Sequence, residues 1–164
     1  MVSIRRAAAS DFTEIWPILH DIFSQGNTYV FPPDTTVEEA YHIWMETPAA
    51  IYVALKNTQI VGTYFLKPNQ PGLGSHVCNA GYAVSSKARG KGIGQAMCEH
   101  SLKEARALGF KAMQYNFVVS TNQAAVNLWK KCGFNIVGRL PNAFKHKEIG
   151  FVDAYIMYQQ LLDY

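Results

Sequence analysis

The sequence predicts one α/β (α+β) domain, residues 1–164, with a mixed central sheet of about seven strands flanked by about four helices. Three observations support this prediction. Short apolar runs rich in β-branched and aromatic residues alternate with stretches whose apolar residues recur at the helical period. A chain of 164 residues is long enough for one domain with a sizeable core. Apolar residues make up 49% and charged residues 16%, which is typical of a globular protein.

The first part of the chain predicts one strand, Val2–Arg6, followed by two helices. The apolar stripe of the first helix continues to Gly26. An aromatic and proline-rich loop, Asn27–Asp34, separates it from the second helix, which carries Trp44 on its apolar side. The residues suited to begin these helices are Ser10 or Asp11 for the first and Thr35 or Thr36 for the second.

The rest of the chain predicts six strands and two helices. One helix leaves the glycine-rich stretch with Ile93 as its first apolar residue and ends near Gly109, and the other is Asn122–Cys132. A long polar loop, Leu140–Phe151, joins the last two strands. The predicted strands are Ala50–Leu55, Ile60–Leu66, His76–Val84, Ala112–Val119, Phe134–Arg139 and Val152–Tyr158.

Charge and cysteine usage exclude several classes of protein. The net charge of +3 comes from mixed signs without a basic run, so we expect no nucleic-acid partner. We see no signal peptide and no long apolar span, and therefore expect a cytoplasmic protein without a membrane partner. The cysteines form an odd set without metal-ligand spacing, which predicts buried free thiols and no bound metal: Cys78, Cys98 and Cys132.

The stretch between the third of three consecutive strands and the next helix has the composition of a phosphate-binding loop. Gly90, Gly92 and Gly94 allow close backbone approach, and a helix start carries partial positive charge. Arg89 and Lys91 add two formal charges. The glycine spacing does not fit the dinucleotide fingerprint, and the nucleotide P-loop would need Ser or Thr after Lys91. The alternative is a turn that only reverses the chain.

A second motif follows one helix and one strand later. It contains Asn122, Ala125, Leu128-Trp129 and Gly133-Phe134. Together with the Arg-x-x-Gly-x-Gly pattern at 89–94, it resembles the signatures of the GNAT superfamily of N-acetyltransferases, over essentially the whole chain. More loosely, the C-terminal segment with Lys145 and Gly150-Phe151-Val152-Asp153 is similar to acetyltransferases of the phosphinothricin type, which act on small amino-acid-like compounds. The resemblance implies the GNAT fold, acetyl-CoA as the cofactor and transfer to an amine.

The resemblance also implies which residues contact the cofactor. The backbone at the end of the third strand would supply an N–H to the acetyl oxygen, and Gly81 just before it is compatible with a bulge or a close approach. The amide of Asn122 would cap its helix and bind the pantetheine arm. The residues that the resemblance places at acetyl-CoA are Tyr82, Ala83, Val84, Arg89, Gly90, Lys91, Gly92, Ile93, Gly94, Gln95, Asn122, Ala125 and Trp129.

Trp129 departs from the family pattern, which usually has a tyrosine there that is proposed to protonate the leaving thiolate. An indole N–H donates a hydrogen bond but is not a usable acid near neutral pH. Protonation then falls to another group or to water, or the assistance is only electrostatic. Tyr82, Tyr115 and Tyr155 are substitutes by residue type alone.

The proton acceptor and the acceptor-binding residues are less evident. The strand before the glycine loop lacks a carboxylate, and His76 is its titratable residue; an exposed strand-end histidine is the alternative. Asn79 and Asn116 can position water or substrate, or serve as ordinary sheet polar groups. The resulting catalytic candidates are His76, Asn79 and Tyr82, and the candidates for binding the acceptor are Tyr29, Phe31 and Asn116.

The sequence thus predicts a homodimeric N-acetyltransferase that moves an acetyl group to a small-molecule primary amine by direct transfer in a ternary complex. A cysteine acyl-enzyme is disfavoured because no histidine partner is visible by spacing. If the C-terminal basic residues face the cleft, the acceptor carries a carboxylate; otherwise they are surface charges: Arg139, Lys145 and Lys147. The alternatives are acetylation of a protein N-terminus or lysine, a non-catalytic coenzyme A-binding sensor, and a structural domain without a ligand.

Overall fold

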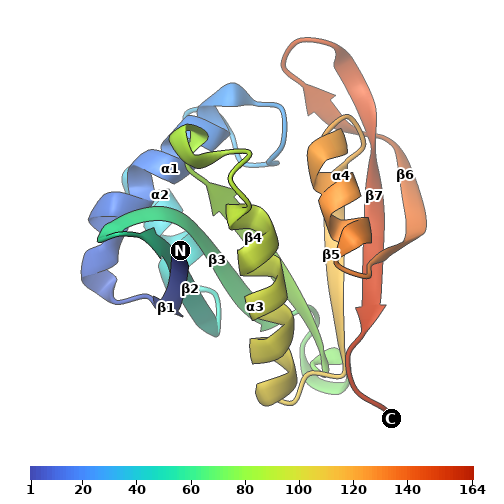
Figure 1. Cartoon of the computed structure of the whole chain (residues 1–164). Helices are drawn as coiled ribbons and strands as arrows, with labels where there is room; N and C mark the ends of the chain where they lie inside the picture. The colour runs from blue at the N-terminus through green and yellow to red at the C-terminus, as the bar shows by residue number, and fades with distance from the viewer.

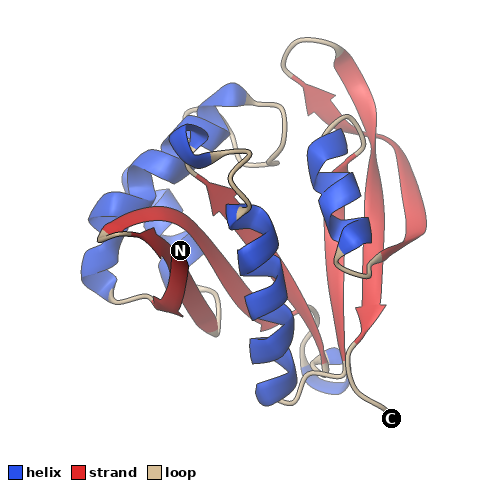
Figure 2. Cartoon of the chain, viewed as in Figure 1, coloured by secondary structure: helices blue, strands red, loops and turns tan.

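The computed structural model describes residues 1–164 as one seven-stranded sheet with helices on both faces (Figure 1, Figure 2). The sheet order is β1-β2-β3-β4-β5-β7-β6, and all neighbours except β4 and β5 are antiparallel. The strands are β1 Val2–Arg6, β2 Ala50–Lys56, β3 Gln59–Pro68, β4 Val77–Val84, β5 Ala112–Val119, β6 Asn135–His146 and β7 Gly150–Gln160. The helices are α1 Phe12–Gln25, α2 Val37–Tyr41, α3 Ile93–Ala107 and α4 Gln123–Lys131. The predicted fold class and element order are confirmed.

Two apolar cores, one on each face of the sheet, hold the helices in place. On one face α3 and α4 pack against alternate strand residues, and on the other face α1 and α2 do so. Burying one such side chain contributes about 1.5–3 kcal/mol. Trp44 is fully buried, and its Nε1–H donates to Thr63 Oγ1 at 3.0 Å, which satisfies its polar group. No helix combines the length and the apolar character needed to cross a bilayer.

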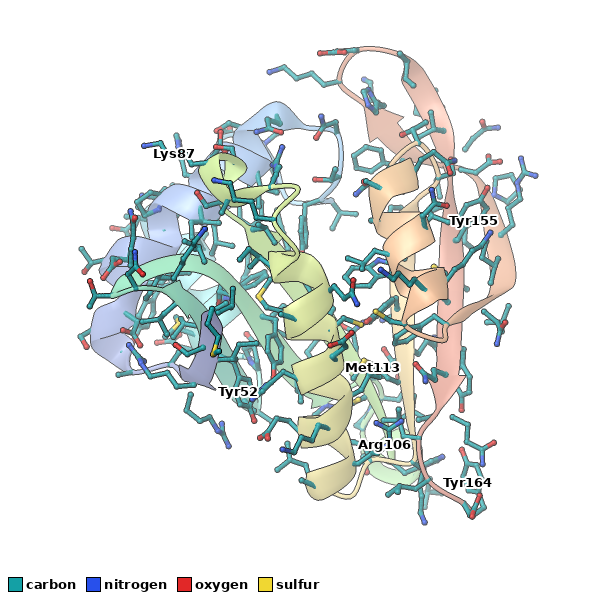
Figure 3. The ribbon with its side chains drawn as sticks, in the orientation of Figure 1. Tyr52, Lys87, Arg106, Met113, Tyr155 and Tyr164 are labelled. Atoms are coloured by element: carbon teal, nitrogen blue, oxygen red, sulfur yellow. The ribbon has the colours of Figure 1, made fainter.

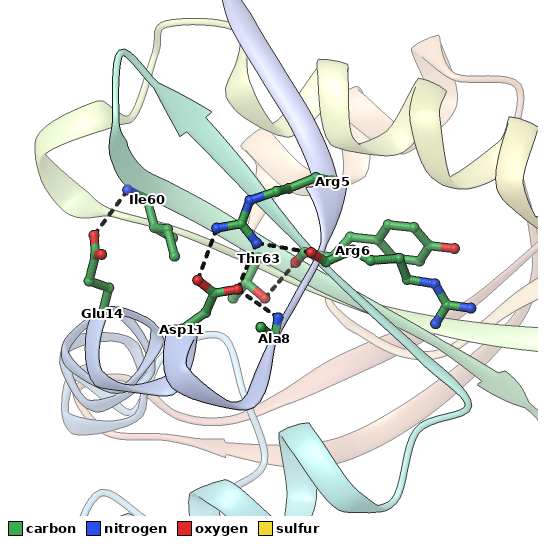
Figure 4. A network of polar contacts seen from close by, with 8 residues as sticks. Arg5, Arg6, Ala8, Asp11, Glu14, Ile60 and Thr63 are labelled. Atoms are coloured by element: carbon green, nitrogen blue, oxygen red, sulfur yellow. Dashed lines mark hydrogen bonds and ion pairs between the residues drawn. The ribbon is translucent and has the colours of Figure 1, made fainter.

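The connection from β1 to α1 is closed by one carboxylate (Figure 4). Asp11 directly precedes α1. Contrary to the prediction, its side chain makes no capping hydrogen bond to that helix. It accepts from the Arg5 guanidinium at 2.7 and 3.0 Å and from the Ala8 N–H at 2.7 Å, and thereby closes a single 3-10 turn. The hydrogen bonds from Arg5 and then from Ala8 hold the pKa of Asp11 below its usual range.

α2 begins as the sequence predicts. Thr36 Oγ1 accepts from the Glu39 N–H at 3.2 Å, and the Glu39 carboxylate accepts from the Thr36 N–H at 2.8 Å. This reciprocal pair satisfies two of the free N–H groups at the helix start. The helix then continues as a π-helical segment, His42–Glu46, which places Trp44 in the core.

β4 and β5 are parallel neighbours for only two residue pairs, Val77–Ala112 and Cys78–Met113. Beyond them β4 remains paired with β3 as far as Val84, whereas β5 remains paired with β7. The two strands therefore diverge, as Figure 1 shows, and Met113, labelled in Figure 3, lies where they are still joined. This divergence opens the sheet in its middle.

The predicted loop Leu140–Phe151 is wrong, because most of it is strand. β6 continues to His146, β7 begins at Gly150, and only three residues form the turn between them. The polar residues that suggested a loop lie on exposed strand positions and in an interruption of the pairing between Leu140 and Phe144, and Gly150 begins β7. There Asn142 has a φ of +51°, and its N–H donates to Asp153 at 2.9 Å, so a bulge bends the strand without ending it.

Candidate functional site

A cleft of about 840 Å³ lies where β4 and β5 diverge. Its walls come from the loop after α1, from β3, β4 and β5, from the glycine-rich loop, from α4 and from the end of β6. This volume is in the range of small-molecule and cofactor sites. The predicted site residues that line it are Tyr29, Phe31, Asn79, Tyr82, Val84, Arg89, Gly90, Gly92, Ile93, Gly94, Gln95, Asn116, Asn122, Ala125 and Trp129.

Three predicted site residues do not line the cleft. His76 is exposed at the end of β4 where the strands are still joined, and its ring meets the Tyr164 ring edge-on, with centroids 6.0 Å apart. Ala83 is 2% exposed, because strand alternation turns its side chain into the core under α1. Lys91 is exposed, and its Nζ donates to the Lys87 carbonyl at 3.0 Å.

The glycine-rich loop leaves an open backbone surface at the start of α3. Gly90 and Gly92 have φ of +72° and +77°, the left-handed region that favours glycine. A Cβ added at either residue would have no atom within 4 Å, so space for a ligand adjoins both. The first hydrogen bond of the helix runs from Ala96 N–H to the Gly92 carbonyl at 3.0 Å, which leaves the preceding N–H groups free. Free N–H groups and the helix dipole favour an anion here.

β4 presents unpaired N–H groups along the other side of the cleft. Ser85 N–H donates to Val61 and Asn69 N–H to the Val77 carbonyl, at 2.9 and 2.8 Å, so odd-numbered residues of β4 pair with β3. The N–H groups of Tyr82 and Val84 therefore point away from β3, toward the side from which β5 has diverged. Two backbone donors at the wall of a cleft can stabilise developing negative charge.

The Tyr82 carbonyl on the same side is already satisfied, because Tyr29 Oη donates to it at 2.7 Å. This bond ties the loop after α1 to the strand, and burial raises the pKa of Tyr29. Gly81 beside it is required by packing: a Cβ there would lie 2.6 Å from Phe65 Cε1 and 3.3 Å from Tyr29 Oη. Since β3 and β4 pair without a register shift, Gly81 is a close approach and not a bulge.

The aromatic floor of the cleft contains Trp129, which is 9% exposed. Its ring centroid lies 4.8 Å from that of Tyr82 and 5.0 Å from that of Tyr115. The hydroxyls of both tyrosines are hydrogen-bonded, and burial raises both pKa values far above their usual range. Tyr155 does not line the cleft. Tyr82 and Tyr115 are therefore neutral at physiological pH, and their hydroxyl groups are already hydrogen-bonded within the protein.

The face of the sheet toward α1 carries a chain of carboxamides. Asn79 Nδ2 donates to the Gln114 carbonyl at 2.9 Å, Gln114 Nε2 to Asn116 Oδ1 at 2.9 Å, and Asn116 Nδ2 to Asn69 Oδ1 at 2.6 Å. With its Nδ2 engaged, Asn79 keeps its Oδ1 as a free acceptor. Since Asn79 lines the cleft, that oxygen is available to an N–H of a bound molecule.

Two ionisable cleft residues were missed by sequence reasoning, Lys67 and His146. Lys67 is the register partner of Asn79, and its Nζ lies 5.4 Å from the centroid of the Phe65 ring without an ion-pair partner. His146 Nδ1 accepts from the N–H groups of Glu148 and Ile149 at 3.1 and 3.4 Å, so the neutral ring carries its proton on Nε2. No single-sequence pattern marks either residue, because strand register brings them to the cleft.

The basic residues considered for a carboxylate do not line the cleft. Arg139 forms an ion pair with Asp153, Lys147 Nζ donates to the Ser24 carbonyl at 3.3 Å, and Lys145 is exposed. No Asp, Glu or Cys lines the cleft. All three cysteines are free thiols, as predicted, although Cys132 is only partly buried. Burial raises the pKa of Cys78 to about 12.

Comparisons with known proteins agree on one family. The model described as "Acetyltransferase (GNAT) family" matches residues 12–134. A solved GCN5-related N-acetyltransferase from Kribbella flavida is 38% identical, with a TM-score of 0.93 over 98% of each chain. A phosphinothricin acetyltransferase from Sinorhizobium meliloti, solved with AcCoA, is 21% identical over 98% of this chain and 88% of its own, and its TM-score of 0.86 shows the shared fold.

Among curated proteins, N-acetyltransferase aca1 of Schizosaccharomyces pombe is 40% identical over 100 residues, which is 60% of this chain and 48% of that protein. Protein SPT10 of Saccharomyces cerevisiae is 32% identical over 85 residues, which is 52% of this chain and 13% of that protein. The chain thus spans half or less of the length of the curated relatives it matches.

Proposed function

Because the chain belongs to the acetyltransferase (GNAT) family, a family of acetyl-CoA-dependent N-acetyltransferases, we propose that it transfers an acetyl group from acetyl-CoA to the primary amine of a small molecule, directly within a ternary complex. One observation carries this proposal. The unpaired N–H groups of Tyr82 and Val84 lie on the same cleft as the open glycine-rich loop at the start of α3. A phosphate-bearing thioester needs both features.

The residues of the cleft fit acetyl-CoA, which supplies a thioester carbonyl when bound. The free N–H groups at the start of α3 would hold its diphosphate, with Arg89 adding charge. Asn122 Oδ1 accepts from the Ala125 N–H at 3.3 Å, which leaves the Asn122 Nδ2 free to donate to an amide of the pantetheine arm. Ligand space beside Gly90 and Gly92 supports this assignment.

The chemistry is performed by donors and by orientation. The N–H of Tyr82 or that of Val84, which lie about 7 Å apart along the strand, would stabilise the charge that develops on the carbonyl oxygen. Asn79 Oδ1 would accept a hydrogen bond from the amine N–H and so orient the nitrogen lone pair toward the thioester carbonyl carbon. An amide oxygen is not a base, the cleft has no carboxylate, and the neutral His146 ring has one nitrogen engaged and the other protonated. The amine would therefore react in its neutral form and lose its proton to water.

The residues of this cleft would offer a leaving thiolate a hydrogen bond, not a proton. Trp129 is the cleft residue at the position of the usual tyrosine, and its indole N–H is a donor only. Tyr82 and Tyr115 direct their protons into hydrogen bonds with each other and with α3. Direct transfer is favoured over an acyl-enzyme because no cysteine lines the cleft.

The acceptor is an amine that also carries an anionic group. Lys67 and Asn79 are opposite each other on neighbouring strands, so their side chains share one face within about 5 Å at Cβ. The Lys67 ammonium has no anionic partner and lies over an aromatic ring at the cleft. An acceptor with an amine at Asn79 and a carboxylate at Lys67 pairs this charge. Phe31, Phe65 and Phe117 suit its apolar part.

A panel of amines tests the function by release of the coenzyme A thiol. We expect turnover with amino acids and weaker turnover with the matched amino-acid amides. Binding of coenzyme A without turnover of any amine would favour the sensor, and preference for peptides would favour protein acetylation. Failure to bind coenzyme A would contradict every one of these functions and leave a structural domain.

The variant Lys67→Met tests the acceptor class. We expect the KM of an amino acid to rise by about tenfold, because one charge-assisted contact is lost, with the KM of its amide unchanged. Lys145→Met is the matched control, since Lys145 is exposed and outside the cleft. Equal effects of Lys67→Met on the acid and the amide would contradict a carboxylate subsite.

We further propose a cytoplasmic homodimer. Three free thiols are typical of a reducing compartment. The edge strand β6 and the start of β7 expose large apolar side chains, with Val137 61% and Phe151 67% exposed, which suits contact with a second copy. Sedimentation equilibrium of wild type and Val137→Glu tests the dimer: a monomer in both would contradict it.

A further inference from the structure

Tyrosine hydroxyls meet across the gap between β4 and β5, on the face covered by α3. Tyr82 Oη lies 2.9 Å from Tyr115 Oη and 2.6 Å from Ser101 Oγ of α3. Main-chain pairing of the two strands ends four residues before Tyr82, at Cys78. These side chains therefore join two strands that are no longer joined by their backbones.

The direction of each hydrogen bond follows from the last acceptor. Ser101 Oγ donates to the Cys98 carbonyl at 2.7 Å, so its single proton is used there. Tyr82 must then donate to Ser101, and Tyr115 must donate to Tyr82. The result is a one-way chain from β5 through β4 to α3, which we term the hydroxyl chain: Tyr115, Tyr82 and Ser101.

The surroundings hold the hydroxyl chain in one geometry. Ser101 is fully buried and Tyr115 is 4% exposed. Phe134 stacks on Tyr115 at 4.2 Å between centroids, and Tyr64 stacks on Tyr82 at 5.6 Å. A buried hydroxyl that loses its partner is destabilising, which favours this single arrangement of the bonds.

Tyr82 is thus fixed from both faces of the sheet. Its hydroxyl is held by Tyr115 and Ser101 on the α3 side, and its carbonyl accepts from Tyr29 on the side of the α1 loop. The one polar group of Tyr82 without a partner is the N–H that points into the cleft. The other hydrogen bonds from side chains of β4 to β5 lead back toward their junction: Asn79 Nδ2 donates to the Gln114 carbonyl, and Tyr82 Oη lies 3.8 Å from Met113 Sδ.

We propose that Tyr115 and Ser101 are positioning residues that act through Tyr82: the hydroxyl chain sets the separation of β4 and β5 and so aims the free N–H groups of β4 at the thioester carbonyl. This inference rests on the proposed function of those N–H groups. It assigns a role to hydroxyls that the transfer step itself does not use.

The test removes single hydroxyls and keeps the rings. Tyr115→Phe breaks the link between the strands. Tyr64→Phe is the matched control, since Tyr64 is also buried beneath α3 and its hydroxyl lies 2.6 Å from His100 Nδ1, but it does not cross the gap. The readout is the ratio of the dissociation constants of coenzyme A and acetyl-CoA, measured by calorimetry without any amine. We expect Tyr115→Phe to lower the preference for acetyl-CoA by about threefold or more, with coenzyme A affinity within about twofold.

Turnover provides the second readout. We expect kcat with the best amine to fall by about tenfold in Tyr115→Phe, with the KM of the amine unchanged, because a misaimed donor acts mainly on the transition state. If Tyr115→Phe lowers only the melting temperature and matches Tyr64→Phe in the affinity ratio and in kcat, the positioning role is overturned. If wild type turns over no amine, the proposed function fails, while the affinity ratio still decides the role of the hydroxyl chain.

Discussion

Glycine is required at position 92 both by the backbone conformation and by the space that the proposed ligand needs. Its φ of +77° favours glycine, and the space beside it is open. Gly92→Val should weaken coenzyme A binding by about tenfold or more, because the side chain fills that space and strains the turn by about 1–2 kcal/mol. Gly109→Val is the control. Gly109 has a similar φ of +84° and similarly open surroundings, but it lies beyond the C-terminal end of α3. Calorimetry should show an affinity loss for Gly92→Val alone.

Trp129 is the residue at which this chain departs from its family. Trp129→Tyr should fold with a loss of about 1–2 kcal/mol, because a smaller ring leaves the contacts with Tyr82 and Tyr115 incomplete. We expect turnover below neutral pH to rise, since a phenol can donate a proton to the leaving thiolate. Trp129→Phe has no donor and serves as the control. Identical pH–rate profiles for the two variants would show that no acid is needed at this position.

At the scale of elements, α4 begins at a residue with two separable roles. Asn122 Oδ1 caps the helix, and Asn122 Nδ2 is proposed to bind the cofactor. Asn122→Ala should lower stability by about 1 kcal/mol and also weaken coenzyme A binding, because both groups are lost. Asn122→Ser should retain the cap and most of the stability while still weakening binding. Thermal melting and calorimetry on both variants separate the roles; wild-type affinity in Asn122→Ser would contradict the pantetheine contact.

The carboxylate in the turn between β1 and α1 should make the free energy of unfolding depend on pH. The pKa of Asp11 is lowered in the folded state, so its contribution is complete above the unfolded value of about 4 and is lost as pH falls through the lower folded value. Asp11→Asn should therefore melt at a lower temperature at pH 7 and lose less than wild type between pH 5 and pH 2. Asp34→Asn, on the exposed loop, is the control and should follow wild type. If the melting temperatures of Asp11→Asn and wild type fell by the same amount between pH 5 and pH 2, this assignment would be contradicted.

At the scale of the whole molecule, the sequence predicted what local pattern controls. Helical periodicity around Ile93 and Met97, and two glycine-containing motifs, were enough for the element order and the family. The divergence of β4 and β5 could not be predicted, because it depends on which partner each strand keeps. For the same reason His76 was placed at the site on the basis of its strand, although it lies at the joined end.

Register explains the cleft residues that were missed. Lys67 reaches the cleft because it is opposite Asn79, and His146 does so because β6 continues through its bulge. Conversely, strand alternation removes Ala83 from the cleft, although both of its neighbours line it. The predicted strands ended before both missed residues, at Leu66 and Arg139, and a single sequence does not specify the register that continues them.

The strand order has a consequence for how the protein is made. β7 is the last strand in the chain, yet it lies between β5 and β6 and pairs with both. While the polypeptide grows on the ribosome, β5 keeps an open edge and β6 has no neighbour until residues 150–160 have emerged. The half of the molecule that carries β1 to β4 can assemble during translation, whereas the other half closes only after the last strand inserts. Premature termination before Gly150 should therefore yield an aggregation-prone fragment with an unprotected strand edge.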